Sequence, residues 1–259
     1  MKFKLLDGTE LDSQSQPYFV AELNTSHFGD LNIAKAMITK AKEIGADCVK
    51  FQSWTADTLY SEDYYKGNPI AKRFIKKYSL SSDELKELAV FCEEINMGFA
   101  STPYSVQEVD FLLNECKPRF IKIASMDLNN IEFLEYIGRT GAPIILSTGM
   151  GSEEEIIRAV EAITATGNTN ICVLHCVSIY PAPDEIINLS YINRLKELFP
   201  NNVIGYSDHS EGEEAPVSSV ALGACLIERH FTLDSEKIGM DNQMSTEPEF
   251  FSRIITKCK

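Results

Sequence analysis

Eight short runs of apolar and β-branched residues recur along this chain, and amphipathic stretches lie between them. An alternation of strand and helix patterns is typical of a parallel sheet covered by helices. Eight such units in about 250 residues match the (β/α)8 TIM barrel, so we predict a single α/β domain of this class. The predicted strands are Tyr18–Leu23, Cys48–Ser53, Gly98–Thr102, Phe120–Ser125, Pro143–Thr148, Ile171–Val177, Val203–Ser207 and Cys225–Thr232.

Four stretches, three between these runs and one after the last run, carry clear helix patterns. In the first, apolar residues recur every three or four positions, as on one face of a helix. Ser152 precedes an acidic first turn, which suits a helix N-terminus. Thr246 stands three residues before Glu249, which is the spacing of a capping box. The predicted helices are Leu31–Ile44, Leu85–Ile95, Ser152–Ile163 and Glu247–Lys257.

A doubly wound open sheet is the competing architecture. It requires a glycine-rich phosphate turn after the first strand, but that strand runs into Glu22–His27 with a single Gly29, and no GxGxxG or P-loop motif occurs. Trp54–Leu80 is the longest interruption of the alternation, and we expect it to lie over one mouth of the barrel. Residues 1–16 are expected to cap the barrel, and residues 1–259 to form one domain without a second one.

The overall charge excludes several classes of partner. Acidic residues outnumber Lys and Arg by 38 to 24, and the net charge of −14 disfavours nucleic acid and anionic membranes. Met1–Asp12 lacks the apolar stretch of a signal peptide, and the most apolar run, Val217–Ile227, is too short to cross a bilayer. The seven cysteines form no CxxC pair, which favours a reducing, cytoplasmic location. Cys172 and Cys176 share a strand face with Leu174, so we expect buried apolar cysteines.

Polar residues gather at the ends of the predicted strands, where an enzyme of the barrel class carries its active site. Buried charges need partners because desolvation is costly. We therefore expect Lys50, Lys122, Glu22 and Glu228 to share one cavity, in which two lysines with Ser, Thr and backbone N–H groups would form a cradle for a phosphate. The strand-end polar residues are Glu22, Lys50, Gln52, Thr102, Lys122, Ser125, Ser147, His175, Ser207, His209, Glu228 and His230.

Two of these residues suggest a metal site. His209 and His230 end neighbouring strands, so their imidazoles can converge. Nitrogen and oxygen ligands without thiolate favour Mn²⁺, Fe²⁺, Co²⁺ or Mg²⁺ over a structural zinc ion. Two buried structural histidines are the alternative interpretation, and the pattern alone leaves it open.

Eight segments of the chain form a recognisable series. They are Ala21–Asp30 (AELNTSHFGD), Gly45–Gln52 (GADCVKFQ), Ser101–Tyr104 (STPY), Ile121–Leu128 (IKIASMDL), Leu146–Gly151 (LSTGMG), His175–Pro183 (HCVSIYPAP), Gly205–Ser210 (GYSDHS) and Ala221–Leu233 (ALGACLIERHFTL). In this order the chain resembles the sialic acid synthase family, which comprises N-acetylneuraminate synthases and their legionaminic and pseudaminic acid relatives.

The resemblance implies a transferase reaction. Members of the family condense phosphoenolpyruvate with the open-chain aldehyde of an N-acetylated amino sugar, and they require a divalent metal. By the resemblance, His209 and His230 would hold the metal, Mn²⁺ first and Mg²⁺ or Co²⁺ as alternatives, and Glu22 would be the catalytic carboxylate. Contacts to phosphoenolpyruvate would come from Lys50, Thr102, Lys122, Ser125, Ser147, Ser178 and Ser207. Contacts to the sugar would come from Gln52, Asp127, Tyr180 and Asp241.

The chain departs from the family pattern in three places. Phe28 stands where many members have Asn, and Gly239–Asn242 reads GMDN where many read GPDH. The GMDN run, together with Asp127, which is often Glu in neuraminate synthases, suggests a sugar other than N-acetylmannosamine. Family members usually continue into an antifreeze-like domain that supplies a sugar-binding Arg to the partner barrel of a homodimer. The sequence ends at Lys259, so we expect weaker sugar binding and weaker dimerisation.

Two other classes of function remain open at this point. A related enzyme could make a shorter keto-deoxy sugar acid, or act as a pyruvate aldolase with a lysine Schiff base, which needs a desolvated lysine of depressed pKa. A third hypothesis is a non-catalytic barrel that binds or assembles, against which the retention of Glu22, Lys50, His209 and His230 argues.

Overall fold

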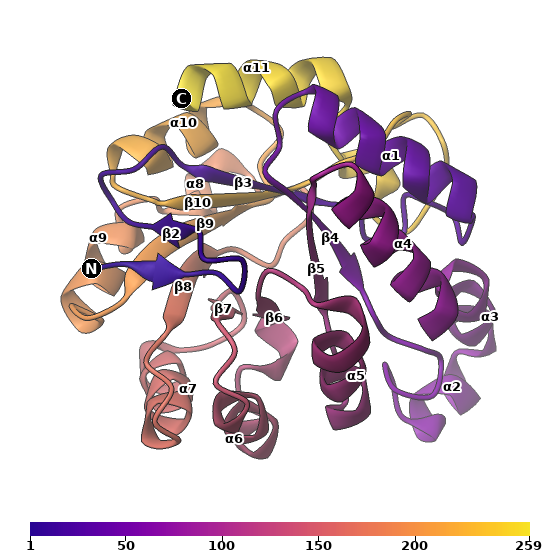
Figure 1. Cartoon of the computed structure of the whole chain (residues 1–259), viewed down its shortest axis with the longest axis horizontal. Helices are drawn as coiled ribbons and strands as arrows, with labels where there is room; N and C mark the ends of the chain where they lie inside the picture. The colour runs from indigo at the N-terminus through magenta and orange to yellow at the C-terminus, as the bar shows by residue number, and fades with distance from the viewer.

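Eight parallel strands close into a barrel in the computed structural model, which describes residues 1–259 (Figure 1). Each strand pairs with the next along the chain, and β10 returns to β3, with His230 opposite Glu22. The predicted TIM barrel and all eight predicted strands are confirmed. The strands are β3 (Tyr18–Glu22), β4 (Cys48–Gln52), β5 (Gly98–Thr102), β6 (Ile121–Ile123), β7 (Ile144–Ser147), β8 (Ile171–Cys176), β9 (Val203–Asp208) and β10 (Leu226–His230).

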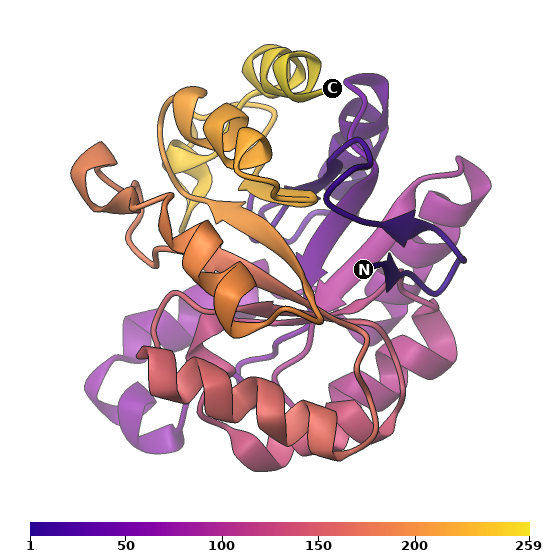
Figure 2. The same cartoon turned by 90° about the vertical axis from the view of Figure 1, so that its left-hand side faces the viewer.

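Helices surround the barrel because each has one apolar face to bury (Figures 1 and 2). In the first, Ala34, Met37, Ile38 and Ala41 are fully buried against the strands. None of the helices has both the length and the apolar character needed to cross a lipid bilayer. The surrounding helices are α1 (Leu31–Glu43), α4 (Ser82–Glu94), α5 (Val106–Phe111), α6 (Ile131–Arg139), α7 (Glu153–Ala165), α8 (Asp184–Ile187), α9 (Tyr191–Leu198), α10 (Glu214–Ala221) and α11 (Pro248–Cys258).

The helix caps agree with the sequence in one case and differ in another. Ser152 and Glu155 form a capping box at the start of α7. The expected capping box of Thr246 and Glu249 at α11 is wrong, because Glu247 is the N-cap residue and makes no side-chain cap. Thr246 Oγ1 instead accepts a hydrogen bond of 2.6 Å from Arg229 Nε, so a tertiary partner occupies the hydroxyl.

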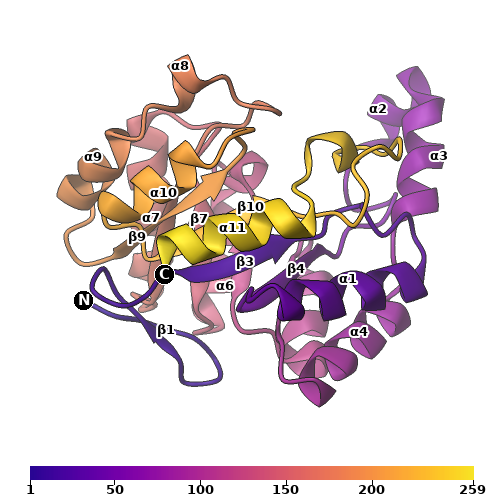
Figure 3. The same cartoon turned by 90° about the horizontal axis from the view of Figure 1, so that it is seen from above.

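A small hairpin covers the N-terminal end of the barrel. Its strands are β1 (Phe3–Lys4) and β2 (Glu10–Leu11). Phe3, Leu5 and Leu11 pack with the inward-facing residues at the start of the barrel strands, and Cys172 and Leu174 belong to the same buried cluster. In Figure 3 this hairpin lies near the start of β3, at the end of the barrel away from α2 (Glu62–Gly67) and α3 (Pro69–Tyr78).

The long segment after β4 lies at that other end, as predicted. It contains α2 (Glu62–Gly67) and α3 (Pro69–Tyr78), toward which β3 points in Figure 3. Trp54, Tyr65 and Tyr78 belong to a small core of its own. Gly29 joins this segment to the barrel: its φ is +72°, and a side chain there would collide with the carbonyl of Lys77.

Candidate active site

A cavity of about 250 Å³ lies at the C-terminal ends of the strands. Strand alternation turns every second side chain inward, so residues from seven of the eight strands or the loops after them meet there. Residues 147 and 207, for example, come from β7 and β9. Most of the site residues predicted from sequence line it, namely Lys50, Gln52, Thr102, Lys122, Ser125, Ser147, Ser178, Tyr180, Ser207, His209 and His230.

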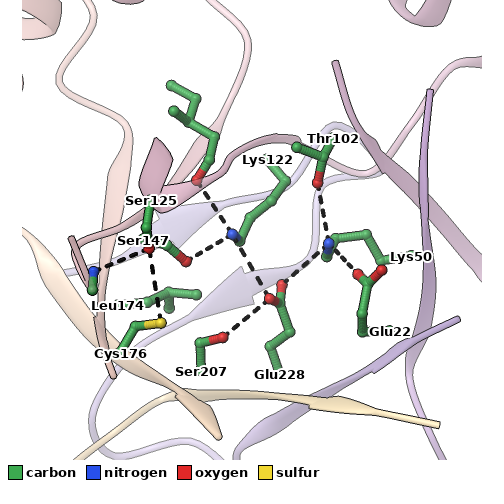
Figure 4. A network of polar contacts seen from close by, with 12 residues as sticks. Glu22, Lys50, Thr102, Lys122, Ser125, Ser147, Leu174, Cys176, Ser207 and Glu228 are labelled. Carbon is green, nitrogen blue, oxygen red and sulfur yellow. Dashed lines mark hydrogen bonds and ion pairs between the residues drawn. The ribbon is translucent and has the colours of Figure 1, made fainter. Parts of the chain in front are cut away.

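On one side of this cavity, Lys50 contacts three polar side chains. It is 3% exposed and forms an ion pair with Glu22 Oε2, its neighbour across β3 and β4 (Figure 4). Its Nζ donates to Thr102 Oγ1 at 3.1 Å and lies 3.9 Å from Glu228 Oε2. Burial by itself would lower the pKa of Lys50, but the carboxylates of Glu22 and Glu228 outweigh it and raise that pKa. Lys50 is therefore a charged ammonium group.

Lys122 lies on the other side of the cavity and contacts a second set of polar side chains. Its Nζ donates to Ser147 Oγ at 2.7 Å and lies 3.7 Å from Glu228 Oε1 (Figure 4). Burial lowers the pKa of Lys122. Glu228 lies between the two lysines and accepts a hydrogen bond of 3.2 Å from Ser207. Burial would raise the pKa of Glu228, but Lys122 and Lys50 outweigh it and lower that pKa. One carboxylate thus faces two cations on the cavity wall.

The imidazoles of His209 and His230 converge as expected, with ring centroids 5.7 Å apart. His209 Nδ1 lies 2.6 Å from the carbonyl of Val177, which can only accept. Nδ1 therefore carries a proton, and Nε2 lies 3.4 Å from Ser207 Oγ. Burial alone would lower the pKa of His209, but the contacts with Cys176 and Val177 outweigh burial and raise that pKa. His230 Nδ1 is buried without a hydrogen-bond partner, and burial together with His209 holds the pKa of His230 well below its usual value. His230 is therefore held as a neutral imidazole, which is the form that binds a metal, whereas His209 would have to lose its second proton to bind one.

The donor set fits an open metal site and not a closed one. No group of three or more His, Cys, Asp or Glu side chains is arranged so that it could hold a metal ion by itself. An ion between His209 and His230 would take its other ligands from water and substrate, which is the pattern of catalytic sites. The ring of Tyr180 lies 4.0 Å from that of His209 and 5.6 Å from that of His230, covering this corner of the cavity.

Two residues of β8 depart from the sequence-based expectation. His175 does not face the cavity: its Nε2 bonds the carbonyl of Ile187 at 2.7 Å, and its ring stacks on Tyr206. Cys176 is buried as expected, but it lines the polar cavity, with Sγ 3.9 Å from His209 Nδ1 and 3.8 Å from Ser125 Oγ. Residues 172, 174 and 176 face inward, so the intervening histidine must face out.

Three predicted site residues lie off the cavity wall. Glu22 sits behind Lys50, and its Oε1 accepts from the backbone N–H of Asn24 at 2.9 Å. Asp127 belongs to a 3-10 turn (Ser125–Asp127), with Oδ2 buried and unpaired. Asp241 accepts a hydrogen bond from Asn24 Nδ2, and burial raises its pKa. These three carboxylates therefore lie near the cavity but do not line it.

The prediction that Glu228 shares the cavity with Lys50 and Lys122 is confirmed, because Glu228 lines the cavity wall. Two further residues, at the wall and directly behind it, were not assigned from the sequence. Tyr104 lines it as well, and its hydroxyl donates to Gln52 Oε1 at 2.9 Å. Trp54 Nε1 donates to the same oxygen at 2.8 Å. Each of β4 and β5 is followed two residues later by an aromatic residue, Trp54 or Tyr104. This spacing could have predicted both residues from the sequence.

A larger hollow, of about 460 Å³, lies at the opposite end of the barrel, beside the N-terminal hairpin. Its Arg119 is paired with Asp7 at 2.8 Å, and no buried lysine, histidine or carboxylate faces into it. Convergent buried polar groups, and not volume, mark the cavity at the C-terminal end as the candidate site.

Comparisons with known proteins agree with these motifs. The profile of the NeuB family matches residues 37–259. An uncharacterized protein of Methanocaldococcus jannaschii is 41% identical over 259 residues, covering 99% of this chain and 74% of that protein. The N,N'-diacetyllegionaminic acid synthase of Campylobacter jejuni is 38% identical over 251 residues, covering 93% of this chain and 75% of the synthase.

Solved structures give the same result. A crystal structure of N-acetylneuraminic acid synthetase from Leptospira borgpetersenii, in complex with citrate, superposes with a TM-score of 0.91 and 33% identity, covering 99% of this chain and 88% of that one. The family resemblance inferred from the motifs is thereby confirmed. The chain belongs to the NeuB family, the enzyme family of the sialic, legionaminic and pseudaminic acid synthases.

Proposed function

We propose that this enzyme condenses phosphoenolpyruvate with the open-chain aldehyde of a 2-acetamido sugar, giving a nonulosonic acid and inorganic phosphate. The observation that carries the proposal is the pair of buried lysines, Lys50 and Lys122, in one cavity with the imidazoles of His209 and His230. Both ammonium groups line one cavity within a protein whose net charge is −14. An anionic substrate therefore has one strongly favoured place to bind.

The proposed reaction forms one carbon–carbon bond and one carbon–oxygen bond, the latter from water, and breaks the carbon–oxygen bond to phosphate. The methylene carbon of phosphoenolpyruvate attacks the aldehyde carbon, and the aldehyde oxygen takes up a proton. Water then adds to carbon 2, where positive charge has developed. The bond from carbon 2 to the phosphate oxygen breaks, phosphate leaves, and carbon 2 becomes the ketone of the product. Water is the only further reactant, so no oxidant or reductant is needed.

The phosphate and carboxylate of phosphoenolpyruvate would lie between the two lysines. Lys50 and Lys122 already point at hydroxyls, on Thr102 and Ser147, so their ammonium groups are oriented before substrate arrives. Such preorganised charges act in a site that excludes water, where electrostatic stabilisation is strong. The hydroxyls of Ser125, Ser178 and Ser207 line the same wall and would complete the cradle.

Glu22 and Glu228 would act differently from one another. Glu22 lies behind Lys50 and contacts it directly, so it would orient that lysine without touching substrate. Glu228 faces the cavity between both lysines and is held by Ser207, so it is the carboxylate best placed to orient the attacking water. The resemblance implied that Glu22 is the catalytic carboxylate. We propose instead that Glu22 positions Lys50.

A divalent cation, Mn²⁺ first and Mg²⁺ or Co²⁺ as alternatives, would be held by His209 and His230. When bound, it would supply a Lewis acid that polarises the aldehyde carbonyl. The residues present support this assignment because the Val177 carbonyl engages His209 Nδ1, which leaves Nε2, 3.4 Å from Ser207 Oγ, as the ring atom that could face a cation, and because His230 Nδ1 has no partner. The sugar would lie nearest to Gln52, Tyr180, Asp127 and Asp241, at the outer part of the cavity.

Phosphate release tests the proposal. Purified enzyme with Mn²⁺ and phosphoenolpyruvate is offered a panel of 2-acetamido and 2,4-diacetamido hexoses, and the 2-keto acid product is identified by mass spectrometry. We expect phosphate release with at least one sugar and none without sugar, and the active sugar identifies the acceptor. Absence of release with every sugar and metal would contradict the proposal.

One observation favours a second candidate, a pyruvate aldolase. The pKa of Lys122 is lowered by burial, which is the property a Schiff-base lysine requires. Borohydride in the presence of pyruvate would then attach a three-carbon adduct to Lys122, detectable by mass spectrometry. We expect no adduct, because the carboxylate of Glu228 and the hydroxyl of Ser147 hold Lys122 as a cation.

A further inference from the structure

The side-chain amide of Gln52 is held by three residues from different parts of the chain. Its Oε1 accepts hydrogen bonds from Trp54 Nε1 at 2.8 Å and from the Tyr104 hydroxyl at 2.9 Å. Its Nε2 donates to Glu22 Oε1 at 3.3 Å. Gln52 and Tyr104 line the cavity, whereas Trp54 is 3% exposed and lies behind the cavity wall.

The chemistry of these partners determines which way the amide points. An indole N–H only donates, so the amide atom that faces Trp54 must be the oxygen. An ionised carboxylate only accepts, so the atom that faces Glu22 must be the nitrogen. Trp54 and Tyr104 together use both lone pairs of the Gln52 oxygen. One N–H of the nitrogen bonds Glu22, and the second has no acceptor within the protein.

We propose that Trp54 and Tyr104 are positioning residues that make Gln52 a hydrogen-bond donor, and not an acceptor, toward the acceptor sugar. The inference rests on the proposed function, since it takes the sugar to be the ligand that meets Gln52. A site of this kind selects a sugar oxygen that can accept a hydrogen bond. It also keeps Glu22 Oε1 engaged by Gln52, which leaves Oε2 for Lys50.

Two substitutions of Gln52 separate a donor from an acceptor. Gln52→Glu keeps an acceptor for Trp54 and Tyr104 but has no N–H to offer, and Gln52→Met has neither group at nearly the same length. If Gln52 donates to the sugar, both variants raise the KM of the sugar at least tenfold. The Kd of phosphoenolpyruvate, measured by calorimetry, changes less than threefold in Gln52→Met. A sugar KM that Gln52→Glu leaves within threefold would overturn the proposal.

Trp54→Phe tests the positioning role, because Trp54 does not line the cavity. It removes the obligate donor while keeping an aromatic ring, so the amide is held on its oxygen side by Tyr104 alone. We expect the KM of the sugar to rise about fivefold with kcat nearly unchanged. Tyr64→Phe, an exposed hydroxyl in the same segment, is the matched control and should leave both constants unchanged. Equal constants in Trp54→Phe and wild type would overturn the positioning role.

The only tryptophan of the chain supplies a readout that needs no turnover. We expect the protein to show a single indole N–H resonance, which would report the hydrogen bond to Gln52. We expect Gln52→Met to move it upfield and Gln52→Glu to leave it downfield. An indole resonance that Gln52→Met does not move would refute the anchoring. If no sugar supports turnover, the proposed function fails, and this resonance still decides whether the amide is oriented as described.

Discussion

Asp208 and Arg229 form a buried ion pair that joins β9 to β10 directly beside the two candidate metal ligands. They are register partners on the outer side of the barrel wall, 1% and 4% exposed, and each precedes a histidine, His209 or His230. Arg229 also donates to the carbonyls of residues 211 and 212. One guanidinium therefore ties together both strand ends that carry an imidazole.

We expect Arg229→Met to lower the free energy of unfolding by about 3–5 kcal/mol, since it leaves the Asp208 carboxylate buried without a partner. Urea denaturation measures the loss. The double variant Asp208→Leu with Arg229→Met should be more stable than the single variant because it buries no unpaired charge. A single variant as stable as wild type would show that the pair does not hold the strands together.

Lys122→Ala should weaken phosphoenolpyruvate binding by about 1.5–3 kcal/mol, the size of a hydrogen bond to a charged group. The reason is the loss of an oriented cation from the cavity wall. Calorimetric titration with phosphoenolpyruvate measures the effect, and Lys40→Ala, which removes a surface lysine, is the control. An effect on sugar binding alone would mean that Lys122 contacts the sugar and not phosphoenolpyruvate.

His230→Ala should abolish Mn²⁺ binding while the protein stays folded, because His230 Nδ1 makes no hydrogen bond that the substitution could break. Electron paramagnetic resonance of free Mn²⁺ gives the affinity. His175→Gln is the matched control, since His175 lies near the end of β8 but faces away from the cavity, so this variant should retain Mn²⁺ binding. Full activity of wild-type enzyme after exhaustive chelation would contradict the metal assignment.

Acid should destabilise the protein through His27. Burial lowers the pKa of His27 to about 4, and its Nδ1 accepts from the backbone N–H of Gly29 at 3.0 Å. The unfolded state therefore binds the proton more readily, and stability falls as the pH drops from about 6.5 to about 4, by about 3 kcal/mol in total. His27→Asn keeps an acceptor without a titration and should flatten this part of the curve. Equal slopes in both proteins would exclude His27 as the cause.

Gly29→Ala should loosen the segment that contains α2 and α3. The backbone at Gly29 has φ +72°, and an added methyl group would push against the carbonyl of Lys77 at the end of α3. We expect a loss of at least about 1 kcal/mol and faster proteolysis within residues 54–80. Gly8→Ala, also at positive φ but in open space, controls for backbone strain alone.

Much of the architecture follows from patterns that are local in sequence. Strand alternation predicted that Lys50 and Gln52 share a face, and the apolar spacing of α1 predicted its buried side. Local patterns could not orient His175, because every residue of β8 is buried and neither face of that strand reads as exposed. Nor could they show that Thr246 bonds Arg229 instead of capping α11, since the competing donor lies on another strand.

Periodicity along the chain and the cost of burying charge were enough to predict the barrel, the buried charges at the strand ends and the two imidazoles. How these groups pair depends on the folded barrel. Glu22 is turned away from the cavity by Asn24 and Lys50, and Glu228 takes its place on the wall. The orientation of Gln52 depends on Trp54 and Tyr104, which follow different strands. Hydrogen-bond partners are chosen by distance in space, and barrel closure brings together residues that no local pattern links.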